Sequence, residues 1–233
     1  MPTIAFDRAS ATYSGRQILK PTTLTLTENR IGIIGENGGG KSTLVRLING
    51  LGPVTGGTVT YEGMNIAKQA KAIRKKVGFI FSDADNQIVM PTVAEDIAFS
   101  LRKRKLSKDE RNRLVQEALE RFGLADHADA SPHLLSGGQK QLLALAAVLI
   151  LNPTTIIADE PTTLLDLRNR LHIRNIFAQL EQQLIVVTHD LDFLMDFDRV
   201  IRVSAGEIVD DGAPKEVIDQ YVSDMTRAEE GRS

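Results

Sequence analysis

The segment 35–43 has the composition and spacing of a phosphate-binding loop. It reads Gly-Glu-Asn-Gly-Gly-Gly-Lys-Ser-Thr and fits the pattern G-x-x-x-x-G-K-[ST] in full. Glycines let backbone N–H groups converge on phosphate oxygens, because no β-carbon stands in the way. Lys41 is expected to reach the β- and γ-phosphates of a nucleotide, and Ser42 to ligate Mg²⁺. The other nucleotide-binding candidates in the loop are Gly35, Asn37, Gly38, Gly39, Gly40 and Thr43.

Two further apolar runs end in side chains that suit phosphate chemistry. The run 155–158 is followed by Asp159 and Glu160, and the run 184–188 is followed by His189. We expect Asp159 to hold Mg²⁺ through water, and Glu160 to polarise an attacking water, a role typically worth ~10²–10⁴ in rate. A neutral imidazole at His189 can contact a γ-phosphate. With Lys41, the residues Glu160 and His189 are the catalytic candidates.

A second glycine motif lies just before the acidic run. Leu135 is followed by Ser136, Gly137, Gly138 and Gln139, and this segment opens an apolar helical pattern at 142–151. The amino terminus of a helix favours bound anions. Ser136 is a natural N-cap, and its hydroxyl can alternatively face a phosphate. The sequence leaves both roles open.

Short apolar runs alternate with helical patterns, which predicts an α/β fold with a parallel core sheet. The runs 30–34, 155–158 and 184–188 are the expected core strands, with function at their carboxyl ends. Alternating and β-branched residues at 3–6, 22–27 and 58–61 predict an antiparallel sheet near the amino terminus. Residues 90–150 are expected to form a helical subdomain, with capping boxes at 92–95 and 107–110. The whole chain, 1–233, is then one domain with a polar, fraying tail at 223–233.

Composition excludes several classes of protein. The chain has 233 residues, no cysteine and a net charge of −2, so thiolate catalysis and disulfide scaffolds are excluded, and nucleic-acid binding is not expected. The longest apolar run has ten residues, which is too short to cross a bilayer. The basic run 102–105 can touch anionic lipid, but the favoured interpretation is the last turn of a helix, where cations suit the dipole.

On these motifs the chain resembles the nucleotide-binding subunit of ATP-binding-cassette (ABC) transporters, from about residue 3 to residue 222. The resemblance implies a P-loop ATPase that uses ATP and Mg²⁺ and hydrolyses ATP to drive transport. It assigns adenine stacking to Tyr13, the γ-phosphate switch to His189 and a dimer-facing loop to 163–166. In this family two copies pack head to tail, so ATP lies between Lys41 of one copy and Ser136 of the other. Such a subunit works on the cytoplasmic face of the bacterial membrane.

One position departs from the family pattern. The family usually has a glutamine after the strand at 77–81, where it links Mg²⁺ to the membrane partner, and this chain has Ser82 instead. Gln87 follows five positions later. Either Gln87 substitutes for the missing glutamine, or the contact with the metal is weaker here.

The segments 85–89 and 91–99 resemble those of ATPases from energy-coupling-factor importers, which take up vitamins, cobalt or nickel. In those complexes a transmembrane coupling subunit and a substrate-binding membrane subunit complete the transporter. The resemblance places Asp83, Asp85, Asn86 and Gln87 where the coupling subunit docks. The sequence as a whole, including Ser82, is most similar to that of the bacterial biotin-importer ATPases.

Three alternatives stay open. The dimer can contain two copies of this chain, which is favoured because each motif is complete, or one copy and a related ATPase. A soluble ABC-type ATPase outside transport is a second class, although Ser136 follows Thr43 by 93 positions and the segment between them holds no sustained heptads of a repair-type coiled coil. A P-loop kinase of small molecules is a third class, and it would not need the Ser136 motif or His189.

Overall fold

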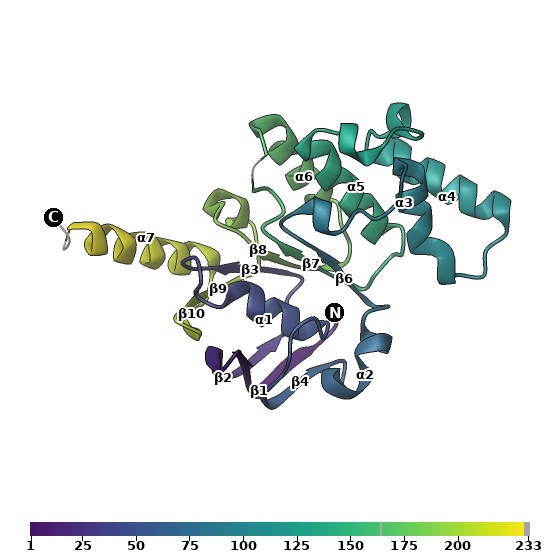
Figure 1. Cartoon of the computed structure of the whole chain (residues 1–233). Coiled ribbons are helices and arrows are strands. Elements are labelled where there is room, and N and C mark those ends of the chain that lie inside the picture. Colours follow the sequence, from purple (N-terminus) through teal and green to yellow (C-terminus); the bar gives the residue numbers. More distant parts are fainter. Residues whose placement is uncertain (164, 231–233) are drawn as a thin grey trace.

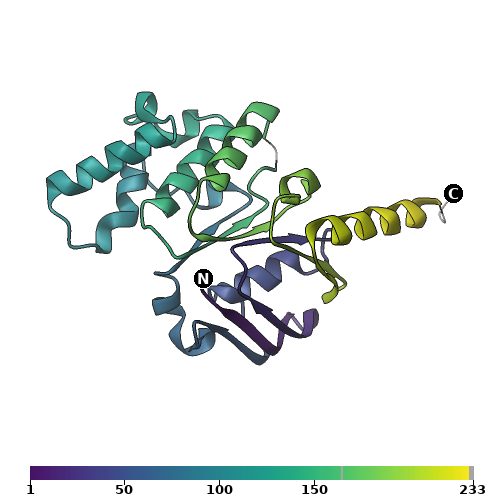
Figure 2. The same cartoon turned by 180° about the vertical axis from the view of Figure 1, so that it is seen from behind.

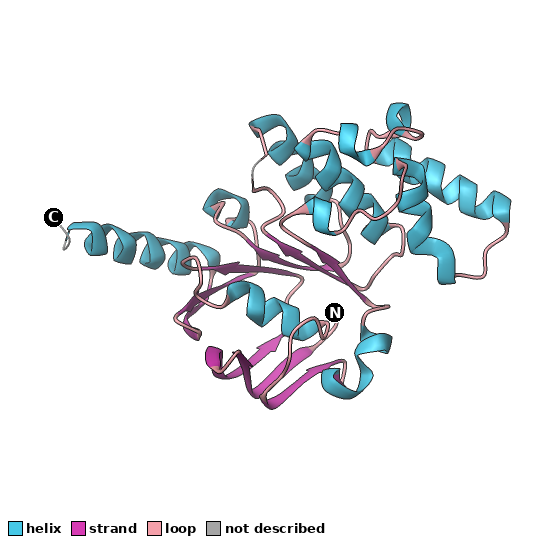
Figure 3. Ribbon diagram, in the orientation of Figure 1, coloured by secondary structure: helices cyan, strands magenta, loops and turns pink. Residues whose placement is uncertain are grey.

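The computed structural model describes residues 1–163 and 165–230 (Figure 1). Two sheets and seven α-helices make up this part of the chain, and Figure 3 shows the strands gathered in two layers below the main group of helices. Within the described residues, no helix combines the length and apolar character needed to span a membrane. Leu164 of the predicted dimer-facing loop lies outside the described residues.

The larger sheet has the strand order β10-β9-β3-β8-β7-β6. Strand β3 pairs in parallel with β8 and β9, β7 pairs in parallel with β8 and β6, and only β10 is antiparallel. The predicted parallel core is therefore confirmed. The strands are β3 (Arg30–Ile34), β6 (Val77–Ile80), β7 (Thr155–Asp159), β8 (Gln183–Val187), β9 (Arg199–Ser204) and β10 (Glu207–Gly212).

The smaller sheet has the order β2-β1-β4-β5, and all of its pairs are antiparallel, as predicted. Its strands are β1 (Ile4–Tyr13), β2 (Arg16–Leu26), β4 (Gly56–Tyr61) and β5 (Met64–Asn65). β1 and β2 are longer than the alternating sequence pattern because register shifts after Phe6 and Ala9 interrupt the alternation.

Successive residues of the core strands pack on opposite faces of the larger sheet. In β7, Ile157 joins the apolar core shared with α1 (Lys41–Ile48) and the smaller sheet, whereas Ile156 joins the core on the opposite face, beneath the helices inserted between β6 and β7. Both side chains are fully buried. This two-sided burial explains why the strand is a continuous apolar run, and it fixes where its last residues emerge.

The remaining helices are α2 (Ile66–Ile73), α3 (Val93–Ser100), α4 (Lys108–Arg121), α5 (Gly137–Leu149), α6 (Leu167–Ala178) and α7 (Pro214–Glu230). Short 3₁₀ turns join them at η1 (Ala84–Asn86), η2 (Leu101–Lys103), η3 (Ala125–His127), η4 (Pro132–Leu134) and η5 (Leu191–Leu194). The segment between β6 and β7 lies entirely within the described residues, and it contains helices joined by turns and loops and no strand, as predicted. Thr92 and Ser107 cap α3 and α4 by accepting a hydrogen bond from the backbone three residues on.

The residues 223–230 of the predicted polar tail form the last turns of α7, which ends at Glu230, and residues 231–233 lie outside the described part. Val217 and Ile218 bury the first turns of α7 against the body. Further along, Asp224 accepts hydrogen bonds from Arg202 of β9 and from Gln220 one turn earlier. Figure 2 shows the far end of α7 extending away from the rest of the chain.

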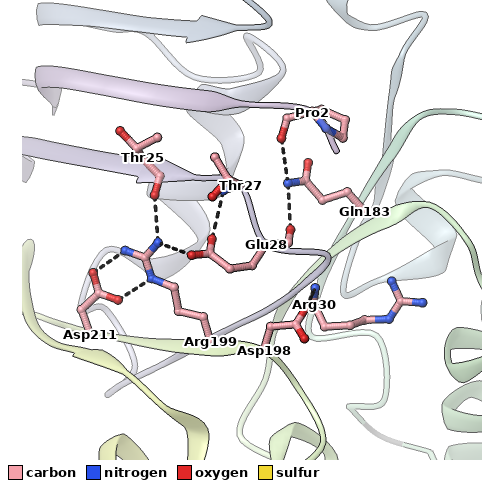
Figure 4. Close-up of polar contacts among 9 residues, drawn as sticks. All are labelled: Pro2, Thr25, Thr27, Glu28, Arg30, Gln183, Asp198, Arg199 and Asp211. Carbon is pink, nitrogen blue, oxygen red and sulfur yellow. Dashed lines mark hydrogen bonds and ion pairs between the residues drawn. The ribbon is translucent and has the colours of Figure 1, made fainter.

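A polar cluster joins the two sheets where β2 leads into β3 (Figure 4). Arg199 of β9 donates to the Thr25 carbonyl, to Glu28 and, through two nitrogens, to Asp211 of β10. Burial acts to raise the pKa of Glu28, but hydrogen bonds from the backbone N–H groups of Thr27 and Glu28 and the charge of Arg199 outweigh it. The pKa of this carboxyl is therefore below its ordinary value. The cluster fixes the smaller sheet against the strands that carry the candidate site.

Candidate phosphate-binding site

The loop 35–40 between β3 and α1 contains three glycines in backbone conformations that L side chains rarely adopt. Gly35, Gly38 and Gly40 have positive φ angles of 136°, 76° and 106°. A β-carbon at Gly35 would lie 2.0 Å from the carbonyl oxygen of Val203 in β9. The carbonyl of Gly39 accepts a hydrogen bond of 2.8 Å from the N–H of Gly206. The β9–β10 hairpin thus holds the loop open at the amino terminus of α1.

Lys41 places its ammonium group at the centre of this loop. The side chain is buried, and Nζ donates to the carbonyl oxygens of Gly35 at 2.7 Å and Glu36 at 3.0 Å. Burial lowers the pKa of Lys41, although the negative charges of Glu160, Asp159 and Glu36 oppose the shift. A phosphate group would bring a further negative charge to this buried cation.

Ser42 and Asp159 come together from α1 and β7 as the sequence predicts. The Ser42 hydroxyl donates to one oxygen of Asp159 at 2.8 Å, and the guanidinium of Arg46 lies 3.3 Å from the other oxygen. The Asp159 side chain is only 2% exposed, so it keeps a cation beside it. A hydroxyl and a carboxylate are hard oxygen ligands of the kind Mg²⁺ takes, completing its shell with phosphate and water. These residues therefore fit a nucleotide-bound Mg²⁺.

Glu160 and His189 meet above the lysine. The backbone of Glu160 has a left-handed φ of 54°, a conformation rare outside glycine, and its N–H donates to the Val187 carbonyl at 2.8 Å. One carboxylate oxygen lies 3.2 Å from His189 Nε2, and the other accepts from Thr163 Oγ1. The strained turn carries the carboxylate across the end of β8 toward the loop.

His189 Nε2 lies close to three polar groups. It lies 3.0 Å from the Asn37 amide oxygen, 3.4 Å from Lys41 Nζ and 3.2 Å from Glu160. A cavity of about 560 Å³ opens beside Glu160 and His189, with Arg170 and Asp190 also on its wall. The site thus joins a lysine, a carboxylate and an imidazole at the mouth of a water-accessible space, which suits hydrolysis of a phosphoanhydride.

The second glycine motif is not part of this cluster. Ser136 caps α5 with a complete capping box, in which its hydroxyl accepts from the Gln139 N–H and the Gln139 side chain accepts from the Ser136 N–H. Gly138 lies against Asn169 of α6, where a β-carbon would come within 2.4 Å of the amide. No polar contact of the described residues joins Ser136, Gly137, Gly138 or Gln139 to the loop 35–40.

Comparison with known proteins agrees with this arrangement. The sequence profile of the ABC transporter family matches residues 19–163. The chain belongs to the ABC transporter family. A putative ABC transporter ATP-binding protein of Bartonella quintana is 46% identical, over 97% of this chain and 100% of that protein. The biotin transport ATP-binding protein BioM of Rhizobium etli is 44% identical, over 94% of this chain and 97% of that protein.

More distant relatives extend the comparison. The energy-coupling factor transporter ATP-binding protein EcfA1 of Levilactobacillus brevis is 37% identical, over 93% of this chain and 81% of that protein. The structure of cbiO1 from Clostridium perfringens, described as part of the ABC transporter complex cbiONQ, has a TM-score of 0.81 at 32% identity, over 94% and 92% of the two chains. The ATP-binding cassette MJ0796, in a dimeric post-hydrolysis state with ADP and phosphate, has a TM-score of 0.82 at 28% identity, over 91% and 98%.

Tyr13 lies at the end of β1, where the resemblance to ABC ATPases predicts adenine stacking. Its side chain is 40% exposed, so part of it is open to a ligand. The Tyr13 hydroxyl approaches Gly52 so closely that a β-carbon at Gly52 would come within 2.7 Å of it. Thr43, in the first turn of α1, is half-buried.

In the segment after β6, Ser82 occupies the position of the usual ABC glutamine, and Gln87 is the residue that could substitute for it. Ser82 is exposed. The Gln87 amide is already engaged, because it donates to the Phe79 carbonyl and accepts from the Phe81 N–H, both at 3.3 Å. Gln87 thus continues the edge of β6 and makes no described polar contact with Ser42 or Asp159.

The predicted partner-facing residues cluster in the turn η1. Asp83 accepts hydrogen bonds from the Asp85 N–H and the Asn86 side chain, and Asp85 forms a double contact with Lys140 of α5 at 2.8 and 3.0 Å. The turn is therefore linked to the helix that Ser136 opens.

Sequence reasoning missed two residues of the site. Arg46 lies four residues after Ser42, so the helical period puts both on one face of α1, and that spacing was the available signal. Asp96, buried in α3, accepts from the N–H groups of Val89 and Met90 at 2.8 and 3.0 Å and so anchors the end of the segment after β6. A lone acidic residue in a helix gave no sign of this role.

Proposed function

We propose that this chain is the ATP-hydrolysing subunit of an energy-coupling-factor-type importer and that biotin is the transported vitamin. The observation that carries the enzymatic part is the meeting of Lys41, Glu160 and His189 at the end of the core sheet. The importer type is supported by the relatives named BioM and EcfA1 and by the likeness to cbiO1, and the cargo by BioM.

Each residue of the cluster has a separate task in this proposal. Lys41 leaves the carbonyls of the loop and neutralises the phosphates of ATP, while Ser42 and Asp159 hold Mg²⁺. Bound Mg²⁺ would withdraw charge from the phosphates and so ease departure of ADP. Glu160 orients the attacking water and takes its proton. His189, held between Asn37 and Glu160, donates a hydrogen bond to the γ-phosphate.

A dimer completes the site. The capped amino terminus of α5 presents Ser136, Gly137 and Gly138 to an anion, yet within one chain it makes no described contact with the loop of Lys41. Two copies packed head to tail bring this terminus onto the ATP of the partner and form two equivalent sites. The dimeric state of the ATP-binding cassette MJ0796 supports this arrangement. ATP closes the pair and hydrolysis loosens it.

The transmembrane coupling subunit docks on the turn with Asp83, Asp85 and Asn86, and a separate membrane subunit binds the cargo. The ion pair of Asp85 with Lys140 supports this placement, because movement of the turn is passed directly to the helix that holds Ser136. Gln87 supports the turn through the edge of β6 instead of serving the metal.

The Glu160→Gln variant tests the mechanism. It keeps the side-chain shape but removes the base, so we expect an ATP-dependent dimer in size-exclusion chromatography with turnover lowered by at least ~100-fold. Ser136→Ala in the same background is the matched control and should weaken the dimer, as it removes the contact from the opposite copy. A Glu160→Gln protein that stays monomeric with ATP and Mg²⁺ would refute the head-to-tail mechanism.

The cargo is tested by expressing this chain in cells from which its own gene has been deleted. Restored uptake of labelled biotin, lost again with Lys41→Ala, is the expected result. Restored uptake of cobalt or nickel alone would overturn the choice of biotin but keep the importer. Purification from detergent-solubilised membranes without any membrane partner would overturn the importer and favour a soluble ABC-type ATPase.

A further inference from the structure

Two segments of the chain are basic without any acidic residue. Residues 63–82 contain five basic and no acidic side chains, and so do residues 97–108. Since the whole chain has a net charge of −2, the rest of it carries −12 (−2 minus +10). The ten side chains are Lys68, Lys71, Arg74, Lys75, Lys76, Arg102, Lys103, Arg104, Lys105 and Lys108.

The fold brings the two basic segments to the same edge of the molecule. The carbonyl of Lys76 accepts hydrogen bonds from the N–H groups of Thr154 and Thr155, and the guanidinium of Arg104 donates to the carbonyl of Leu151. Both segments therefore flank the loop that enters β7. In Figures 1 and 2, α2 and the corner between α3 and α4 lie on the side of the molecule opposite α7. We call these ten side chains the basic edge.

The basic edge is exposed, although the exposed carboxylates of Asp109 and Glu110 follow it directly in sequence. All ten residues are exposed, and none takes part in an ion pair among the described residues. Arg102 and Arg104 donate to backbone carbonyls, as the helix-end interpretation predicts, but the seven lysines make no described side-chain hydrogen bond. Elsewhere on the surface, Lys20, Lys140 and Lys215 each have a carboxylate partner within 2.9 Å. Repulsion among unpaired like charges opposes folding, so this surface is suited to an anionic partner.

We propose that the basic edge binds an anionic phospholipid surface. Seven of its ten cations are lysines, which act as point charges and suit a diffuse layer of headgroups better than a fixed pattern of acceptors. A single-stranded nucleic acid would need exposed aromatic side chains for stacking, yet Phe79 is buried and Phe99 is covered by Arg102 at 3.7 Å.

The position of the basic edge keeps this contact separate from ATP. The edge lies where β6 and β7 begin, whereas Asp159 ends β7. β7 has five residues, so four steps of ~3.3 Å put its two ends roughly 13 Å apart. Lipid and nucleotide can therefore bind at the same time. The contact depends neither on the proposed cargo nor on the dimer, and it would orient the subunit at the membrane.

Co-sedimentation of the purified chain with vesicles tests the inference. We expect binding to vesicles of phosphatidylglycerol mixed with phosphatidylcholine, none to pure phosphatidylcholine, and loss of binding in ~0.5 M salt. The variant Lys103→Gln, Lys105→Gln, Lys108→Gln should lower the partition coefficient by roughly 100-fold, since each lysine near an anionic surface is worth about a fivefold change.

The matched control removes the same charge elsewhere, with Arg16→Gln, Arg113→Gln and Lys215→Gln, all at exposed positions. It should bind vesicles nearly as well as the unaltered chain, and both triple variants should keep the melting temperature and ATP binding. The proposal would be overturned if both triple variants lost vesicle binding equally. It would also be overturned if the unaltered chain bound neutral vesicles as well as anionic ones. Displacement from vesicles by a DNA oligomer at equal phosphate concentration would reassign the edge to nucleic acid. Failure here leaves the proposed transport function untouched.

Discussion

Arg46→Met should destabilise the nucleotide-free protein and spare the nucleotide-bound one. Removing one partner of a fully buried ion pair costs about 3–5 kcal/mol. Asp159 is buried, but the Arg46 side chain is 40% exposed and the Ser42 hydroxyl remains bonded to the carboxylate. Solvent screening therefore reduces the expected cost to about 1–2 kcal/mol. For a chain of this length that lowers the melting temperature by roughly 2–8 °C.

Differential scanning fluorimetry with and without Mg²⁺ and ATP measures this effect. Because Mg²⁺ supplies the positive charge that the variant lacks, the deficit should shrink when both are added, and ATP with a chelator should not shrink it. Adding Asp159→Asn to Arg46→Met should restore stability without nucleotide, since no buried charge then remains. Arg113→Met is the control, because its pair with Glu117 is exposed on both sides. A deficit that Mg²⁺ and ATP leave unchanged would refute the idea that Arg46 stands in for the metal.

Three other substitutions test the loop, the sheet junction and the adenine contact. Gly35→Ala should abolish ATP binding and lower the free energy of unfolding by about 3 kcal/mol or more, because its β-carbon meets a backbone carbonyl at 2.0 Å. Gly137→Ala is the control: its β-carbon enters open space, so this variant should have the same free energy of unfolding as the unaltered chain. Since the pKa of Glu28 is lowered in the folded state, its stabilisation is present above the ordinary value of 4.5 and is lost as pH falls through the folded value. In urea unfolding at pH 7, the Glu28→Gln variant should therefore have a lower free energy of unfolding than the unaltered chain. This difference should disappear as the pH falls below 4.5. Gly52→Ala should push Tyr13 aside and weaken binding of a fluorescent ATP analogue several-fold, with melting temperature nearly unchanged; full affinity would rule out stacking on Tyr13.

The core strands and the phosphate-binding loop could be predicted because local signals and tertiary context agree there. A strand buried on both faces must be apolar throughout, as 155–158 is, and the loop needs glycines wherever φ is positive. The cluster of Lys41, Asp159 and His189 then follows from one rule, that parallel strands end at the same edge.

The features that could not be predicted depend on partners distant in sequence. Residues 223–230 look like a tail because they are polar, yet they continue α7, and Asp224 within them pairs with Arg202 of β9. Gln87 looks available for a metal, and only the fold reveals that the edge of β6 uses both ends of its amide. No pattern along the chain carries either contact.

The capping box of Ser136 has a mechanical consequence. A hydroxyl has one proton to donate and two lone pairs, and capping uses only a lone pair, to accept from the Gln139 N–H. The proton is free for a phosphate oxygen, so the two roles that the sequence left open are compatible. The segment can therefore engage and release an anion without losing any bond of its own. In the proposed dimer this amino terminus would meet a nucleotide without rearranging its own hydrogen bonds, and the adjustment would fall on Lys41, which has to leave the loop carbonyls.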